Sequence, residues 1–186
     1  MVSKFELFKN INIKHINIMK EPYINEQLLN DNLIIEPKDL NSDIDIIIRD
    51  KLKNQVEGVC FKDGYIIPDS VKIINRKIGK IYTLDNKSCI VYNINYKAKV
   101  IAPAEGDIIE TTINNINKMG AIGYIKVNSE QSIDESPLII MIPSEYFIDT
   151  PYNIDDININ QKLNIVVIGL RIKFNSDKIQ IIGKPV

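Results

Sequence analysis

The amino-acid sequence predicts an α+β unit followed by an all-β unit, and three observations support this order. One segment, between residues 40 and 54, has apolar residues at helical spacing. Segments in which apolar and polar residues alternate stand on both sides of it. From residue 107 onward the alternating segments continue without a second helical pattern. Strands grouped around one helix, and then strands alone, indicate an α+β unit and an all-β unit in succession.

The composition is that of a soluble globular protein. Hydrophobic residues make up 45% of the 186-residue chain and charged residues 25%. The sequence has no run of about 18 apolar residues and no apolar segment near its N-terminus, so we expect neither a membrane span nor a secretory signal. Cys60 and Cys89 match no metal-binding spacing, and a reducing, intracellular compartment is expected. Roughly one residue in five is Ile, which we attribute to an AT-rich genome.

Alternation at residues 5–19 predicts a long first strand. The phase of the alternation changes near His15, as it does at a β-bulge. Residues 20–38 contain two prolines in a polar stretch, and we expect a loop there with one short strand at 32–36.

The helical segment is expected to pack one face against the strands. Its apolar residues recur at i, i+4, i+7, i+8 and i+12, which is the spacing of a buried stripe. Asp43 and Asp45 place negative charge in the first turn, where the helix dipole stabilises it. The helix is expected to end near Asn54. The stripe comprises Leu40, Ile44, Ile47, Ile48 and Leu52.

Further strands follow the helix. Residues 55–68 are typical of a strand, a tight turn and a second strand, with Gly64 in the turn. Residues 70–84 and 88–102 add two more strand segments. The first hundred residues are therefore predicted to form an antiparallel sheet with one helix across it.

The segments from residue 107 onward predict a five-stranded barrel. Five short strands, with a longer connection between the third and the fourth, have the count and rhythm of an OB barrel. Gly120 and Gly123 would let the second strand wrap over the first without an intervening Cβ. We place the boundary between the units so that the domains are 1–102 and 103–186. The strands are expected at 107–116, 120–127, 138–142, 162–170 and 178–182.

Several short motifs, in order and in both halves of the chain, resemble one known family. They are Glu57-Gly58 after the helix, the Gly64 turn, the strand from Tyr96-Lys97-Ala98 to Pro103, Gly106 before the barrel, and Asn117-Lys118-Met119-Gly120. With this order, the chain resembles the larger stalk subunit of multisubunit DNA-dependent RNA polymerases, which is subunit seven of the eukaryotic enzyme and has a direct counterpart in the archaeal one. The resemblance covers most of the chain and is weakest over 20–36 and 128–160.

The resemblance implies an architecture and a role. Residues 1–102 would be a tip domain that docks on the polymerase core near the clamp, and residues 103–186 an OB domain held near the RNA exit path. Neither domain of this family is catalytic; the stalk supports initiation and the handling of nascent transcript. The implied partners are the large core subunits, a smaller helical stalk subunit in some members, and nascent RNA through weak contact, with no membrane.

The sequence offers no catalytic arrangement. Its one histidine, His15, has no partner motif nearby. The carboxylate pairs Asp43/Asp45 and Asp155/Asp156 lack a third ligand at metal-site spacing, so we interpret them as solvated surface. Phosphate-binding glycine motifs are absent from the sequence. We expect no catalytic residue, no metal, no cofactor, and a chain that is a polymerase component without enzymatic activity of its own.

The charge of the barrel half opposes RNA binding, although a local positive patch is still expected there. Residues 101–186 carry seven basic and eleven acidic side chains, a net charge of −4, while the first hundred residues carry +3. Negative charge opposes affinity for a phosphate backbone. A local patch on or beside the first, second and fourth barrel strands is the candidate RNA site. For its tyrosine, Tyr124, the alternative is that the ring packs in the barrel. The patch comprises Lys118, Tyr124, Lys126, Arg171 and Lys173.

The hairpin at 58–65 is the candidate for docking on the polymerase core. Its turn is tight, and we expect Phe61 and Tyr65 to be exposed near the tip of the hairpin, where large aromatic groups suit a buried protein interface. The excess positive charge around Arg76 and Lys77 is a second candidate for contact with the core, or a solvated face. The hairpin set comprises Gly58, Phe61, Lys62, Asp63, Gly64 and Tyr65.

One alternative function stays open at this point. A free-standing OB-fold protein that binds single-stranded nucleic acid, such as a translation factor, would also contain the barrel. Affinity of the isolated chain for single-stranded RNA would separate the two hypotheses. The biased composition favours a divergent polymerase, such as that of a large DNA virus. The expected location is then the host cytoplasm or the virion, or the nucleus for a cellular protein.

Overall fold

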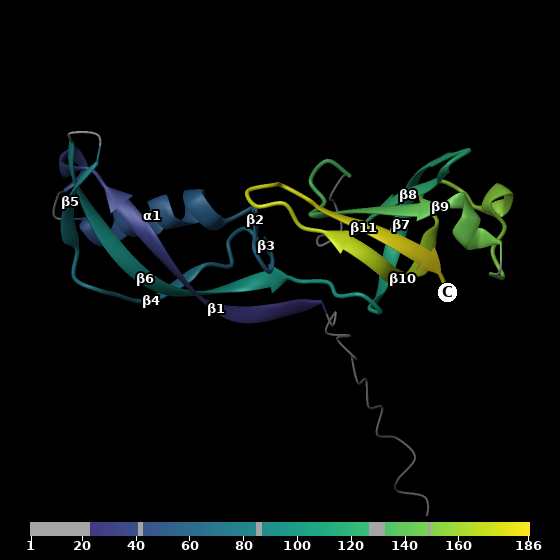
Figure 1. The fold of residues 1–186 in the computed structure, drawn as a ribbon, viewed down its shortest axis with the longest axis horizontal. Coiled ribbons are helices and arrows are strands. Elements are labelled where there is room, and N and C mark those ends of the chain that lie inside the picture. The colour runs from purple at the N-terminus through teal and green to yellow at the C-terminus, as the bar shows by residue number, and fades with distance from the viewer. Residues whose placement is uncertain (1–22, 41–42, 85–86, 127–132, 149) are drawn as a thin grey trace, which may run out of the picture.

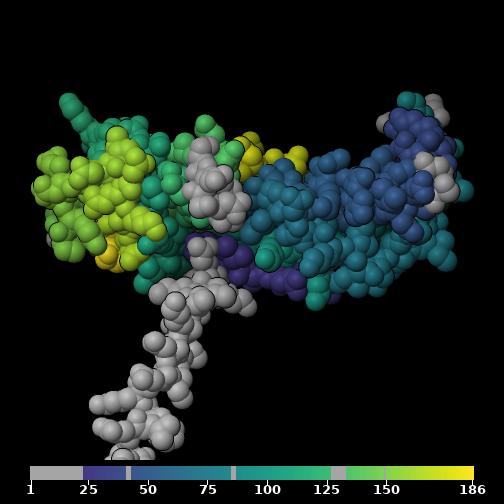
Figure 2. Space-filling view, turned by 180° about the vertical axis from the view of Figure 1, so that it is seen from behind, coloured from purple at the N-terminus to yellow at the C-terminus, as the bar shows by residue number. Residues whose placement is uncertain are grey.

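The structure of the chain is a computed structural model that describes residues 23–40, 43–84, 87–126, 133–148 and 150–186. The strand predicted at residues 5–19, with His15, lies outside the described residues. The N-terminal sheet and its helix form one end of an elongated molecule, and the barrel forms the other end (Figure 1). A view from behind shows the same outline, with the two parts in direct contact (Figure 2).

Two long antiparallel strands support the N-terminal sheet. β1 (Ile24–Ile35) pairs along its whole length with β6 (Lys87–Ile101). The prediction of a loop over most of 20–38 is therefore wrong, and the short strand predicted at 32–36 is the end of a strand that begins at Ile24. Gln27 and Asp31 lie on the half-buried face of β1, and these polar residues hide the alternation in the sequence.

Shorter strands pair along the other side of β6. β2 and β3 form the strand–turn–strand pattern predicted at 55–68, whereas the single strand segment predicted at 70–84 is divided into β4 and β5. β3, β4 and β5 are all antiparallel to β6, and β2 lies beyond β3. The strands are β2 (Cys60–Phe61), β3 (Gly64–Ile66), β4 (Lys72–Arg76) and β5 (Lys80–Leu84).

One helix, α1 (Ile44–Val56), covers a face of this sheet. Ile48, Leu52 and Val56 are buried against side chains of β1 and β6, as the helical spacing predicted for the first two. The helix begins four residues later than the predicted stripe and ends two residues beyond Asn54. The 3-10 turn η1 (Pro37–Asp39) precedes it, and the Leu40 amide donates to the Pro37 carbonyl instead of starting the helix. Leu40 is consequently exposed.

The second half of the chain is a closed five-stranded barrel, as predicted. The order of its strands is β10-β11-β9-β8-β7, and the long connection between β9 and β10 contains two 3-10 turns, η2 (Ser144–Phe147) and η3 (Ile154–Asp156). β9 and β11 run parallel, and the other pairs are antiparallel. The strands are β7 (Ile108–Asn117), β8 (Gly120–Tyr124), β9 (Leu138–Pro143), β10 (Lys162–Arg171) and β11 (Ile179–Pro185).

Two glycines allow β8 to approach both of its neighbours. A Cβ at Gly123 would overlap the hydroxyl of Thr111 on β7, so this position serves the predicted wrapping of the second strand over the first. Gly120 has φ +144°, and a Cβ there would overlap the Ile142 carbonyl of β9. Its close approach is therefore to β9, where the sequence suggested β7.

The sheet and the barrel share one hydrophobic core at their junction. Tyr23, Cys60, Tyr65 and Ile101 pack into the cluster formed by the barrel interior. Every strand up to Ile101 belongs to the sheet, and every later strand belongs to the barrel; the domain boundary at 102/103 stays a prediction. α1 has 13 residues, and the described part of the chain holds no helix that could cross a membrane.

Candidate docking and nucleic-acid-binding surfaces

The predicted docking hairpin lies at the junction between the sheet and the barrel. The Cys60 amide donates to the Ser176 carbonyl at 2.7 Å, and the Asn175 amide donates to the Cys60 carbonyl at 2.8 Å. Both of these partners lie in the loop between β10 and β11. The hairpin therefore extends its hydrogen bonding onto the barrel of its own chain.

The expectation that Phe61 and Tyr65 are exposed aromatics is wrong. Tyr65 has only 8% of its surface exposed, and it belongs to the shared core. Phe61 is half-buried against the core under α1. Gly64 is buried as well, and only Lys62 and Asp63 at the turn are exposed. The hairpin set is thus largely internal, because the barrel, which is distant in sequence, covers it.

Burial also keeps the Cys60 thiol and the Tyr65 phenol of the hairpin neutral. Burial, with a smaller effect from the Asp177 carboxylate, raises the pKa of the Cys60 thiol to about 11. Burial raises the pKa of Tyr65 too, with further contributions from Cys60 and Asp177. At neutral pH the hairpin therefore brings neither a thiolate nor a phenolate to the junction.

A cluster of exposed apolar side chains lies at the opposite end of the sheet. Ile78 is 90% exposed and Ile81 is 77% exposed, values far above those of core residues. All five residues of β5 are exposed, although three of them are apolar. β5 lies at the end of the molecule farthest from the barrel (Figure 1). We call this group the distal apolar end; it comprises Ile78, in the loop before β5, and Ile81, Tyr82 and Leu84 of β5.

Sequence reasoning missed the distal apolar end. Arg76 and Lys77 precede its apolar residues and Lys80 lies among them, so the charge of the segment masks its apolar character. A signal was nevertheless present, because "KIYTL" has too many large apolar residues for a strand that only one neighbour covers.

The positive charge of this region is partly paired. The Arg76 guanidinium donates to the Asp45 carboxylate at 2.9 Å, and its carbon lies 5.2 Å from the centre of the Tyr92 ring. Lys97 lies 3.4 Å from the Glu26 carboxylate across β1 and β6. Such exposed pairs contribute little to stability, but they reduce the charge that is free to attract a partner.

The structure divides the candidate RNA set between the two ends of β8. Lys118 lies in the turn before β8, while Tyr124 ends that strand. Tyr124 lies in one row with Ile139 of β9, Gln180 of β11 and Arg171 of β10. The Lys126 ammonium lies 5.8 Å from the centre of the Tyr124 ring. These residues bring Lys126 and Arg171 to the same end of the barrel, away from Lys118.

Two further observations weaken this set as an RNA site. Tyr124 is buried, so its ring offers no open face on which a base could stack. Lys173 lies in the loop between β10 and β11, and its carbonyl accepts from the Ser176 amide. This loop lies beside the β2–β3 hairpin, which we call the junction hairpin. That loop is one of the two that bind oligonucleotides in OB folds, and here the N-terminal sheet covers part of it.

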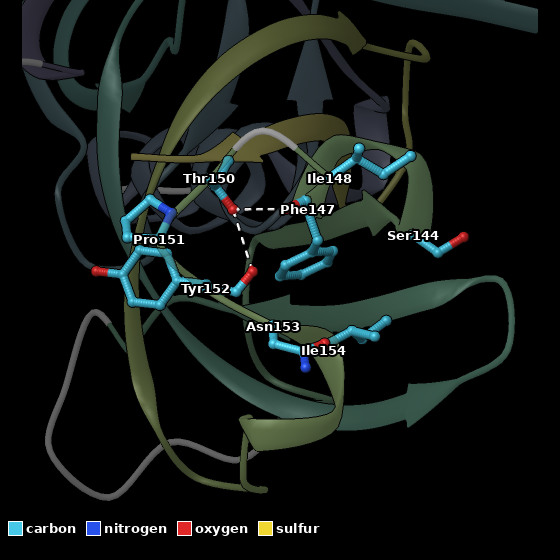
Figure 3. Close-up of a pocket in the computed structure, with 8 residues that line it drawn as sticks. All are labelled: Ser144, Phe147, Ile148, Thr150, Pro151, Tyr152, Asn153 and Ile154. Atoms are coloured by element: carbon cyan, nitrogen blue, oxygen red, sulfur yellow. Dashed lines mark hydrogen bonds between the residues drawn. The ribbon is translucent and has the colours of Figure 1, made fainter.

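A hollow lies within the connection between β9 and β10 (Figure 3). The Thr150 hydroxyl donates to the carbonyls of Phe147 and Tyr152, at 3.0 and 3.3 Å, and this fixes the turn around the hollow. The eight lining residues include no charged side chain. The hydrogen bonds of Thr150 therefore hold the connection in shape around the hollow.

The carboxylates form no metal site within the described ranges. No group of three His, Cys, Asp or Glu side chains comes together there in an arrangement that could hold a metal ion. Asp45 is paired with Arg76, as described above, and Asp155 and Asp156 are exposed in η3.

Comparison with known proteins supports the resemblance to polymerase stalk subunits. No family profile matches the chain. The DNA-directed RNA polymerase II subunit rpb7 of Dictyostelium discoideum is 28% identical to it over 94 residues, which are 50% of this chain and 52% of the relative. The chain thus spans about half the length of the relative that it matches. This similarity is distant, and the observed sheet with one helix followed by a closed five-stranded barrel is consistent with the tip and OB architecture expected of a stalk subunit.

Proposed function

We propose that the chain is a non-catalytic stalk subunit of a DNA-dependent RNA polymerase, supporting initiation and the handling of nascent transcript. The similarity to the rpb7 subunit carries this proposal. The two-part architecture supports it, because a sheet unit and a barrel that share a core form a single elongated body. Such a body can attach at one end while the other end projects from the enzyme.

The proposed contact with the large core subunits is the distal apolar end. A monomeric protein rarely leaves several large apolar side chains together in solvent, and such patches mark interaction surfaces. Within the described residues, β5 pairs only with β6, so its second edge is also available to a partner. The junction hairpin can reach a core subunit only through Lys62 and Asp63, so we assign core docking to the distal apolar end.

Contact with RNA is proposed to be weak and to depend on the assembled polymerase. Lys126 and Arg171 provide positive charge at one end of the barrel, but the net charge of residues 101–186 is −4. Each additional phosphate contact would strengthen binding in a manner that depends on salt. The enzyme would therefore have to deliver the transcript to the barrel, since the barrel cannot capture it from solution.

The other partners and the source are extensions of the same proposal. A smaller stalk subunit would bind beside this chain if the polymerase has one. The viral source and the location in host cytoplasm rest only on the composition, while the similarity to rpb7 favours a location wherever the polymerase acts. The free-standing OB-fold alternative is not favoured by that similarity.

Affinity purification of the tagged full chain from its native cells tests the proposal. We expect the large polymerase subunits to co-purify with the wild-type chain. The double substitution Ile78→Asp with Ile81→Asp should reduce their recovery by roughly tenfold or more, because it places charge in the proposed interface. Ile159→Asp, at an exposed apolar position of the barrel half, is the matched control and should leave recovery unchanged.

Two outcomes would count against the proposal in different ways. Recovery of the wild-type chain without any polymerase subunit would reject the stalk function itself. Equal recovery with the double variant and with the wild type would reject only the distal apolar end as the docking surface. An unchanged urea midpoint of the double variant would show that any loss of recovery is not a loss of folding.

A further inference from the structure

The outer face of the barrel carries an apolar groove that the proposed function does not use. The groove has a volume of about 300 Å³ and crosses β8, β9 and β11, which lie side by side in the barrel (Figure 1). We call it the barrel groove. Its apolar side chains are Met119, Ile122, Met141, Pro143 and Ile182.

The strand register explains why these side chains gather outside. Ile122, Met141 and Ile182 are directly opposite one another on adjacent strands. Their chain neighbours Ala121 and Ile142 are buried in the barrel interior, so the alternation of the strands turns the groove residues outward. Met119, in the turn before β8, is 83% exposed.

The apolar row continues onto a fourth strand. Gly169 of β10 pairs with Ile182, and the register shift beside it leaves Ile168 exposed on the barrel surface. Adjacent strands are about 4.8 Å apart, so a row across four strands is roughly 14 Å long. This length is enough to receive several side chains of one partner segment.

The chemistry of the groove does not suit nucleic acid. In OB folds the surface of the second and third strands binds oligonucleotides, and bases stack there on aromatic rings. In this chain the corresponding strands are β8 and β9, and the groove residues on them are Ile and Met. Methionine is flexible and polarisable, and it is over-represented where a surface must adapt to apolar protein segments.

We propose that the barrel groove binds an amphipathic helix of a partner protein, with acidic residues beside its apolar stripe. The barrel is closed, so its strands offer no free edge to which an extended peptide could add. Binding must then occur through side chains across the strands. An apolar stripe at i, i+4 and i+7 of a helix is about 10 Å long, which matches the three-strand row of the groove.

The charges around the groove specify the acidic flank. Lys118 precedes Met119 in the turn, and Lys184 lies two residues beyond Ile182 on β11. Neither lysine forms an ion pair with another described residue. Glu145 lies in η2, two residues after Pro143, and these three side chains together give the rim a net positive charge. Acidic side chains of the partner would face this rim.

The barrel groove and the distal apolar end lie in different halves of the molecule. β5 and the loop before it carry the distal apolar end, whereas the groove lies on β8, β9 and β11. Both surfaces can therefore be occupied at once. The groove proposal stands whether or not the chain is a polymerase subunit.

Fluorescence anisotropy with the full chain and a labelled synthetic peptide tests the proposal. The probe is an amphipathic helical peptide with Leu along one face and Glu on both flanks. We expect saturable binding that weakens with added salt. Met141→Asp and Met119→Asp should each weaken it by roughly tenfold, while Ile108→Asp, at an exposed apolar position outside the groove, should not change it. A probe with Lys in place of Glu should bind less tightly than the Glu peptide.

The same variants distinguish a protein groove from an RNA site. Absence of binding by the wild-type chain, or equal affinity of wild type and Met119→Asp, would overturn the proposal. A single-stranded RNA oligonucleotide that displaced the peptide and lost affinity in Met141→Asp would overturn it in favour of an RNA site. Met119 is in a turn and largely exposed, so Met119→Asp should keep the wild-type urea midpoint and its result can be interpreted even if Met141→Asp unfolds.

Discussion

Two hairpins at opposite ends of β6 differ in burial. The β2–β3 hairpin packs Cys60 and Tyr65 into the core shared with the barrel, whereas the hairpin that β5 forms with β6 leaves Ile81 and Tyr82 of β5 in solvent. Their sequences are similarly apolar. The difference is their position along β6, because β3 pairs with its last two residues and β5 pairs with its first five.

This comparison shows how one sheet can serve an internal and an external contact. β6 has 15 residues and is therefore roughly 50 Å long. The chain enters the barrel where β6 ends, so a hairpin near that end is covered by its own barrel. A hairpin at the other end has no further part of the described chain to cover it, and a partner can do so.

The largest expected difference between the two hairpins is in stability. Tyr65→Ala should lower the free energy of unfolding by about 3 kcal/mol, because it removes an aromatic ring from the shared core. Tyr82→Ala should change it by no more than about 0.5 kcal/mol, because Tyr82 is 49% exposed. Urea denaturation of both variants and the wild type measures the two effects.

The two tyrosines form a matched pair, since the same atoms are removed in both variants. Equal losses of stability would contradict the assignment of one hairpin to the junction and the other to the surface. If Tyr65→Ala kept the stability of the wild type but recovered less of the polymerase subunits in the affinity purification, the result would instead support the sequence-based prediction that the β2–β3 hairpin docks on the polymerase.

A smaller loss of stability is expected from a substitution in the β10–β11 loop, which holds the junction hairpin. Asn175 has φ +62°, and its amide donates to the Cys60 carbonyl. Asn175→Val should cost about 1–2 kcal/mol, because a β-branched residue is strained in this left-handed conformation. Asn175→Gly keeps both the conformation and the amide, so its urea midpoint should be no lower than that of the wild type. A stable Asn175→Val variant would show that the loop does not hold the hairpin.

The last expected effect is confined to alkaline pH, where the stability of the fold should depend on pH. In the folded chain the pKa of Cys60 is about 11, compared with 9.0 for an ordinary thiol. Because the folded value is the higher one, this contribution is complete below pH 9 and is lost as the pH rises to about 11. Urea midpoints of the wild type should therefore fall over this range more steeply than those of Cys60→Ala. Parallel curves would mean that the Cys60 thiol ionises equally easily in the unfolded and folded chains.

Elements with their own periodicity could be predicted from the sequence. The stripe containing Ile48 and Leu52 located α1, and the five barrel strands were found within a few residues of their observed bounds. β1 was largely missed because Gln27 and Asp31 lie on its inner face, where alternation predicts apolar residues. Local pattern identifies an element only when its inner face is uniformly apolar.

The surfaces could not be predicted in the same way, because they depend on contacts that are distant in sequence. Tyr65 and Tyr82 are both aromatic residues in short strands, and nothing within ten residues of either shows that the β10–β11 loop covers one of them. The lysines and aromatics proposed for RNA were likewise chosen by type, while the register sends Lys118 and Lys126 to opposite ends of β8. Burial by a distant loop and position along a strand are properties of the assembled fold.

The length of β6 has a mechanical consequence. One strand runs from the distal apolar end to Ile101 at the edge of the barrel, so the sheet can act as a lever. Over roughly 50 Å, a tilt of about 5° at the attached end would carry the far end through about 4 Å. A small rotation of whatever holds the distal end would thus swing the barrel by the width of a side chain.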